Sequence, residues 1–249
     1  MQSRRSTRRS ALVLARTKLA DQDLILTMIA PEGDQFRAVA KGARKPGSRL
    51  SARTELFCEV NLLVSEGRGL AIITEAQLVD AHASLRSDLD RVAAASAICE
   101  VARLTCYEDV TDPFLYPVLS RALRAVCEAD KTELLDLVVA AYVFKVLSHG
   151  GWRPVLDSCV ACGEPSGSRL SVAAGGLLCD SCAREVAGAH AIDHNMVLWL
   201  EALIGWTFDE LVAASIDAQT ADSLLRYAHE WAATHLDARL RALEFFIGL

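Results

Sequence analysis

The sequence predicts an α+β protein of more than one domain, in which a small N-terminal β-barrel precedes a larger helical body. Residues 10–80 form short apolar runs separated by turns, whereas helical periodicity begins near residue 84. The two parts also differ in charge. Residues 1–53 carry twelve Lys and Arg against four Asp and Glu, a net charge of +8, while the rest of the 249-residue chain carries −14. A basic N-terminal segment followed by an acidic remainder suggests that one end of the molecule binds a polyanion.

Five apolar runs predict the strands of the barrel. They are residues 11–15, 23–29, 35–40, 57–65 and 70–76, and turn-forming sequences such as Pro31-Glu32-Gly33-Asp34 separate them. Five short strands within about 70 residues fit a five-stranded OB-fold barrel. We therefore expect a basic N-terminal extension at residues 1–9 and an OB-fold domain at residues 10–82.

Helix-start signals recur after residue 84. Ser87-Asp88-Leu89-Asp90 predicts a helix through roughly residue 107, and Asp112-Pro113 predicts another toward residue 128 that Pro117 bends or delays. A nearly all-apolar helix is expected over 132–149, ended by Gly150-Gly151. Helical pattern returns over 193–205, 207–215 and 220–246. We expect an α-helical domain at residues 84–249, interrupted by an irregular insert at about 154–190.

Four of the eight cysteines form one array inside that insert. Cys159 and Cys162 precede Cys179 and Cys182 in a C-x2-C-x16-C-x2-C spacing, which is typical of a structural four-thiolate zinc site in a zinc-ribbon-like insert. We expect one structural Zn²⁺, because four thiolates leave no open coordination position for catalysis. Two disulfides or a redox pair are the alternatives, and His190 and His194 are weaker candidate ligands.

The common signatures of catalysis are absent from the sequence. There is no P-loop, no H-E-x-x-H and no G-x-S-x-G, and no nucleophile, base and orienting group stand together. Uncharged stretches such as residues 92–99 and 137–144 span only eight residues, far short of the about 18–20 that a membrane span needs. The basic start lacks the apolar core of a signal peptide. These features predict a cytoplasmic binding protein rather than an enzyme, with no membrane and no small-molecule substrate.

Several segments carry the motifs of a known family. They are ALVLARTKLADQDLILTMIAPEGDQFRAVAKGARKPGSRL, FCEVNLLVSEGRGLAIITEAQLVDA, GGWRPVLDSCVACG with the later GGLLC-x-x-C, and HLDARLRALEFF. Together they resemble the bacterial DNA-repair family RecO over nearly the whole chain. The resemblance implies an N-terminal OB-fold, a helical C-terminal domain and a zinc-binding region. It also implies a nucleoid-associated recombination mediator, which binds single- and double-stranded DNA, anneals complementary strands and acts with RecR to displace SSB so that RecA can load.

The basic segment of the barrel supplies the candidate DNA-binding residues. Only Phe36 and Phe57 are aromatic within residues 1–80, so base stacking is scarce and phosphate contacts should dominate binding. The candidates are Arg37, Lys41, Arg44, Lys45, Arg49 and Arg53, with Arg16, Lys18 and Arg68 in second rank. A mobile, solvated loop is the alternative interpretation of the run from Lys41 to Arg53. The alternative function is a zinc-stabilised protein-interaction scaffold without direct DNA readout.

Overall fold

The computed structural model describes residues 6–67, 69–165 and 167–249. Two compact units make up this part of the chain. The first contains the described residues up to Ala95 together with Ala102–Cys127, and the second contains Ser96–Val101 and Glu128–Leu249. The domain boundaries expected from the sequence, at residues 1–9, 10–82 and 84–249, stay a prediction.

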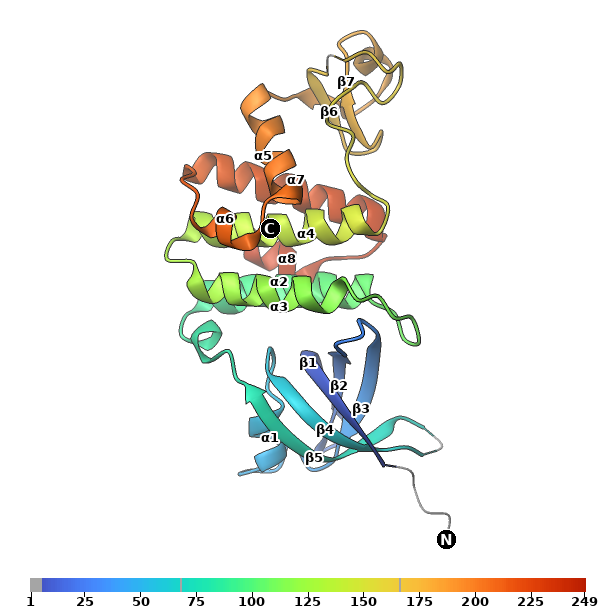
Figure 1. Ribbon diagram of the computed structural model, residues 1–249, viewed down its shortest axis with the longest axis vertical. Helices are drawn as coiled ribbons and strands as arrows, with labels where there is room; N and C mark the ends of the chain where they lie inside the picture. The colour runs from blue at the N-terminus through green and yellow to red at the C-terminus, as the bar shows by residue number, and fades with distance from the viewer. Residues whose placement is uncertain (1–5, 68, 166) are drawn as a thin grey trace. The chain divides into compact units, whose positions relative to one another are not determined.

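Five strands of the first unit close into a barrel, as predicted (Figure 1). They are β1 (Ser6–Leu19), β2 (Asp23–Ile29), β3 (Gln35–Ala40), β4 (Glu59–Ser65) and β5 (Ala71–Asp80), in the order β1-β2-β3-β5-β4. β3 and β5 are parallel, and the other neighbouring strands are antiparallel. This five-stranded ring is OB-like and confirms the predicted fold of the N-terminal part.

Strand alternation places one set of side chains inside the barrel. Leu26 and Met28 of β2 and Val60 and Leu62 of β4 point inward and are almost completely buried. Burying such side chains stabilises the fold by about 1.5–3 kcal/mol each. The intervening residues of each strand therefore face outward, where polar and charged side chains can gather.

β1 begins earlier than the apolar run at residues 11–15 indicates. Ser6–Leu12 pairs with Ser65–Glu59 of β4 in an unbroken antiparallel register. Arg8 and Arg9, which the sequence assigns to an extension, are therefore residues of the barrel wall. Backbone pairing with β4 fixes this segment, although its side chains are polar.

A short helix, α1 (Arg49–Arg53), lies between β3 and β4 in the chain. The Ser48 side chain accepts a hydrogen bond from the Ser51 amide and caps its N-terminus. The segment before it is bonded to the turn between β1 and β2, because the Gly42 amide donates to Asp23 and the Arg44 amide donates to the Gln22 carbonyl. The basic run from Lys41 to Arg53 is thus held by the barrel rather than being an unattached loop.

After a 3₁₀ turn at Ala83–Arg86, the helices α2 (Leu89–Thr105) and α3 (Leu115–Glu128) follow the barrel in the chain. Asp88 caps α2 by accepting a hydrogen bond from the Arg91 amide, as its position in the sequence predicts. The start of α3 is delayed to Leu115, which leaves Pro117 in the first turn, where no intrahelical amide bond is lost.

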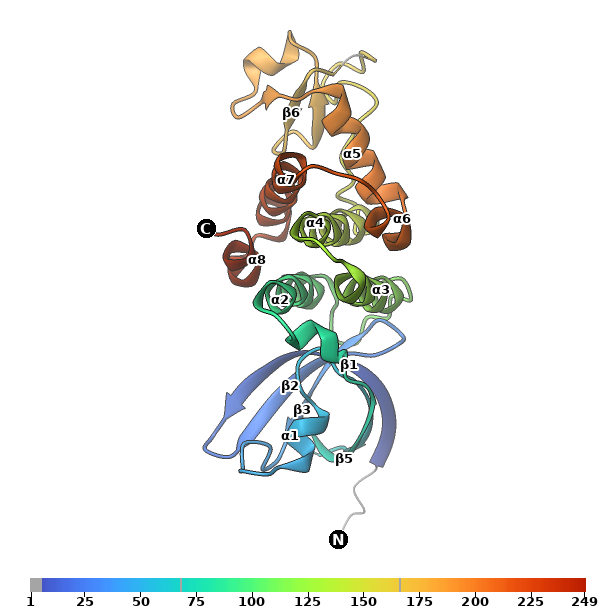
Figure 2. The same cartoon turned by 90° about the vertical axis from the view of Figure 1, so that its left-hand side faces the viewer.

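The second unit is built around α4 (Thr132–His149), whose bounds match the prediction. It is buried over nearly all its faces and lies between α6 (Phe208–Val212) and α7 (Ala218–Leu236) (Figure 2). α5 (His194–Gly205) also packs on α4. No helix within the described residues is both long enough and apolar enough to cross a membrane.

The single helix predicted over 220–246 is wrong. The chain instead forms α7 and a separate α8 (Arg241–Phe246), because Asp237 adopts a left-handed conformation with φ 45° and ends α7. The carboxylate of Glu100 accepts hydrogen bonds from the Ala242 and Leu243 amides at 2.9 and 3.1 Å. These bonds satisfy the exposed amides at the start of α8 and make the break stable.

A small antiparallel sheet forms the insert between α4 and α5. Its strands are β6 (Arg169–Ser171), β7 (Gly176–Leu178) and β8 (His190–Ala191), in the order β7-β6-β8, with a 3₁₀ turn at Cys182–Glu185. The structure therefore confirms a helical C-terminal part with a small four-cysteine insert.

Candidate nucleic-acid interface and metal site

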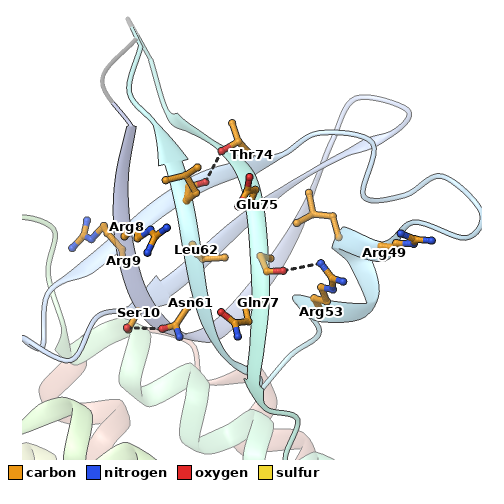
Figure 3. A pocket seen from close by; sticks show the side chains of 13 residues that line it. Arg8, Arg9, Ser10, Arg49, Arg53, Asn61, Leu62, Thr74, Glu75 and Gln77 are labelled. Carbon is orange, nitrogen blue, oxygen red and sulfur yellow. Dashed lines mark hydrogen bonds between the residues drawn. The ribbon is translucent and has the colours of Figure 1, made fainter. Parts of the chain in front are cut away.

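A hollow on the outer surface of the barrel gathers four arginines (Figure 3). Arg8 and Arg9 come from β1, and Arg49 and Arg53 come from α1. The hollow has a volume of about 720 Å³, and among its described lining residues the one acid is Glu75. This excess of positive charge on an open surface suits a polyanion.

The register of the sheet explains how the floor of the hollow is built. Arg8 is paired with Leu63 and Leu63 with Glu75, so these three side chains share the outer face of β1, β4 and β5. The next row on the same face is Ser10, Asn61 and Gln77, in which the Ser10 hydroxyl donates to Asn61 at 2.7 Å. The floor therefore combines Leu63 with polar side chains, and the arginines stand at its borders (Figure 3).

The four arginines are engaged to different extents. Arg53 donates from Nη1 to the Ala76 carbonyl at 3.0 Å, and Arg9 pairs with Asp34 at 2.5 Å and lies 3.9 Å from the centroid of the Phe36 ring. Arg8 and Arg49 are exposed and form no ion pair with any described residue. Those two guanidinium groups are the most available to an incoming phosphate.

Three other predicted DNA-binding arginines have partners inside the protein. Arg37 forms an ion pair with Glu108 at 2.6 Å, and Arg16 pairs with Glu55 and donates to the Ser51 hydroxyl at 2.8 Å. Arg44 donates to the main-chain carbonyls of the β1–β2 turn, at 2.8 Å for Asp21. Each of these side chains has a structural role. A phosphate that binds one of them would have to share the guanidinium with its present partner or displace that partner.

The predicted lysines are exposed and free of ion pairs within the described residues; they are Lys18, Lys41 and Lys45. Arg68 lies outside the described residues, as do Arg4 and Arg5 of the expected extension. Of the nine predicted side chains, the structure brings Arg49 and Arg53 together in the hollow. It adds Arg8 and Arg9, whose all-polar segment, Ser6–Ser10, carries no strand pattern in the sequence and is a strand through its pairing with β4.

The two aromatic residues of the barrel are not available for stacking on bases. The Arg9 guanidinium covers Phe36, and Phe57 is buried with a left-handed backbone at φ 70°. The barrel's own side chains therefore favour phosphate contacts.

The four cysteines of the insert come together as a possible metal site. Their sulfur atoms all lie within 4.8 Å of one another, and the sulfurs of Cys162 and Cys179 are 3.9 Å apart. β6 and β7 pair as a hairpin, which brings the second pair of cysteines back to the first. All eight cysteines of the chain are free thiols, so the disulfide alternative has no support.

The two turns of the site have the same backbone bond. The Gly163 amide donates to the Cys159 carbonyl at 2.8 Å, and the Ala183 amide donates to the Cys179 carbonyl at 3.0 Å. Gly163 has φ +76°, a left-handed conformation that a glycine adopts without strain. Each turn presents two sulfurs on one side, which is the arrangement that a tetrahedral cation needs.

Hydrogen bonding shifts the pKa values of these thiols in opposite directions. The Cys179 amide is the main cause that lowers the pKa of Cys159 to about 6, while bonds with the Cys179 and Cys162 thiols raise the pKa of Cys182 to about 12. The Cys159 thiolate therefore forms readily. The other thiols, which share protons through hydrogen bonds, would release these protons when a cation binds. His190 stacks on Tyr227 at 5.3 Å instead of joining the cluster.

The other cysteines behave as apolar side chains. Cys58, Cys99 and Cys106 are buried, and Cys127 is half-buried. Burial raises the pKa of Cys106 to about 12, so its thiol stays protonated at neutral pH.

Comparison with known proteins agrees over both parts of the chain. The family models "Recombination protein O N terminal" and "Recombination protein O C terminal" match residues 1–82 and 86–244. The DNA repair protein RecO of Bifidobacterium adolescentis is 32% identical over 238 residues, which cover 93% of this chain and 95% of that protein. The DNA repair protein RecO of Bifidobacterium longum, in two strains, is 31% identical and covers 95% of this chain.

Proposed function

The chain belongs to the RecO family of non-catalytic DNA repair and recombination proteins, and on this premise we propose that it binds DNA through the outer surface of its barrel. The main contacts come from Arg8 and Arg49 at the borders of the arginine hollow, together with Arg53 of the same hollow. The exposed Lys41 and Lys45, which precede α1 in the chain, add further positive charge. The observation that carries this proposal is the grouping of four arginines around one acid.

Binding through phosphate contacts is compatible with the annealing of complementary DNA strands. Guanidinium groups bind phosphate oxygens without reading base edges, so single and double strands of any sequence are accepted. The base edges stay free to pair while the phosphate charge is neutralised. We propose that the protein anneals complementary strands, and that with RecR it acts on SSB-coated DNA so that RecA can load. Its site of action would be the cytoplasm, at the nucleoid.

Cys159, Cys162, Cys179 and Cys182 would hold one structural Zn²⁺. Tetrahedral zinc with bonds of about 2.3 Å places its sulfur ligands about 3.8 Å apart, and the separation of 3.9 Å between Cys162 and Cys179 fits this distance. When bound, the ion would supply folding free energy to the insert rather than chemistry. The stability of the insert would depend on such an ion, because its strands are only two or three residues long.

Annealing of complementary SSB-coated strands, with and without RecR, tests the proposed function. The double variant Arg8→Gln/Arg49→Gln should anneal several-fold more slowly than the wild type. The matched control removes two exposed arginines of the second unit, Arg226→Gln/Arg239→Gln, and should anneal at the wild-type rate. If the wild type does not anneal, the proposed annealing function is wrong. If both double variants are slowed equally, the proposed site is wrong. A protein-interaction scaffold would show neither annealing nor direct DNA binding.

A further inference from the structure

A second hollow lies on the outer face of β1, β2 and β3, and it has a different character. Its volume is about 560 Å³, and residues of all three strands line it together with the chain around the end of α2. Ile25 and Leu104 supply apolar surface, while Arg37 and Arg103 supply positive charge. The strands β2 and β3 form the face on which OB-folds commonly bind oligonucleotides.

Tyr107 brings to this face the aromatic ring that the barrel's own strands do not offer. It is 61% exposed and lines the hollow, although it follows α2 in the sequence. Its backbone is fixed, because its carbonyl accepts a hydrogen bond from the Gln35 amide of β3 at 3.0 Å. The neighbouring residue, Glu108, forms a parallel bridge with Gln35. A ring held on a rigid backbone and open to solvent loses little entropy when a flat ligand stacks on it.

The charge around Tyr107 matches a nucleotide rather than an apolar partner. Arg37 and Arg103 both line the hollow, and the Glu108 carboxylate offsets one of them by pairing with Arg37 at 2.6 Å. Both members of this pair are about half exposed. Exposed ion pairs contribute about 1 kcal/mol or less, so a phosphate can displace the carboxylate and take its place on Arg37.

We propose that Tyr107 is a stacking platform for a base of single-stranded DNA, with Arg103 and Arg37 contacting the phosphates on either side. This inference rests on the proposed function, since it adds a base contact to a protein that otherwise binds phosphates. Only an unpaired base can stack on the ring, so the site favours single strands over duplex. Glu108 weakens binding, because a phosphate has to displace its carboxylate from Arg37. It therefore adjusts the affinity without contacting the base.

The test compares two strands that share phosphates but differ in bases: a thymidine oligonucleotide and an abasic strand of the same length. Tyr107→Ala should bind the thymidine strand about 5- to 150-fold more weakly, the range expected for one stacked base. Its binding to the abasic strand and to duplex DNA should be unchanged. The matched control, Tyr107→Phe, keeps the ring and should bind like the wild type. Because stacking displaces no counterions, the salt dependence of Tyr107→Ala should also equal that of the wild type.

Glu108→Gln gives an independent readout of the neighbouring charge. Removing the competing carboxylate should tighten binding to both strands several-fold and leave the slope of log K against log salt unchanged, because Arg37 neutralises the same phosphate in both proteins. Equal affinities of Tyr107→Ala and wild type for the thymidine strand would overturn the proposal while leaving the proposed function standing. An equal loss on the abasic strand would also overturn it. If the wild type binds neither strand, the proposed function itself fails.

Discussion

The guanidinium of Arg53 donates a hydrogen bond from Nη1 to the main-chain carbonyl oxygen of Ala76 at 3.0 Å. The bond attaches α1 to β5. It lies further along β5 than Ala71 and Ile72, the two residues of that strand that pair with β3. Arg49, one helical turn earlier, lines the same hollow without such a bond. Two arginines of one short helix therefore have separable roles, one mainly in holding the helix and one mainly in facing solvent.

Exchanging each of these arginines for glutamine should separate binding from stability. Arg49→Gln should weaken DNA binding severalfold and leave the free energy of unfolding within about 0.5 kcal/mol of wild type. Arg53→Gln should weaken binding as well and lower the free energy of unfolding by about 0.5–1.5 kcal/mol, because the bond to Ala76 is lost. Urea unfolding and DNA titration of both variants check this. Equal stability of the two variants would contradict a structural role for Arg53.

A buried glycine in the turn between β2 and β3 should tolerate no side chain. Gly33 has φ +88°, and a Cβ there would lie 1.8 Å from the main-chain oxygen of Asp112. Gly33→Ala should therefore lower the free energy of unfolding by at least about 2 kcal/mol. Gly47→Ala is the control: Gly47 has φ +73° but nothing within 4 Å of the added Cβ, so only backbone strain of about 1–2 kcal/mol applies. A Gly33 variant no less stable than the Gly47 variant would rule out close packing against Asp112.

Loss of one cysteine ligand should remove the metal and destabilise the insert together. Zinc sites of this kind bind with about 10–16 kcal/mol, so Cys159→Ser should reduce the zinc content and lower the melting temperature. Cys127→Ser changes a half-buried cysteine outside the cluster and should keep the full zinc content. Metal analysis and thermal melting of both variants check this. Purified wild-type protein that contains no zinc under reducing conditions would contradict the assignment.

Lys145 should give the stability of the second unit an unusual dependence on pH. Burial lowers the pKa of Lys145 from 10.5 to about 8, although Glu210 opposes the shift. Between pH 8 and 10.5 the unfolded chain holds this proton and the folded chain has released it. Stability from this group therefore rises with pH through that window.

Lys145→Met removes this titration, so the wild type should gain stability relative to the variant as pH rises from 8 to 10.5. Taking the difference between the two proteins cancels the titration of cysteines and tyrosines. Urea unfolding at several pH values checks the prediction. A constant difference between wild type and variant across this range would show that the lysine is not desolvated in the folded state.

The barrel and most helix bounds could be predicted because local signals agree with the tertiary structure. Asp88, Asp193 and Thr207 each stand just before an apolar run and each caps a helix. The cysteine spacing likewise predicts the cluster, since each C-x2-C turn is a local structure. In such places neighbouring residues in the sequence determine the geometry.

The rest of the candidate site depends on partners that are distant in the sequence. Arg8 and Arg9 belong to β1 only because β4 supplies the backbone partner. The end of α7 depends on a left-handed Asp237, and the start of α8 depends on the Glu100 carboxylate. Tyr107 reaches the barrel through a bond to Gln35, 72 positions earlier in the chain. None of these partners can be read from a pattern within one segment.

The salt dependence of binding to a single-stranded oligonucleotide tests the central claim most directly. If about six side chains neutralise one phosphate each, log K should fall with log salt with a slope of about −4, a loss of roughly 300-fold between about 50 and 200 mM. Reversing Arg8, Lys41, Lys45 and Arg49 to Glu should flatten that slope by about 3 and weaken binding to all sequences alike, with an unchanged melting temperature. A reversed variant that keeps the affinity and slope of the wild type would contradict DNA binding by the basic surface of the barrel.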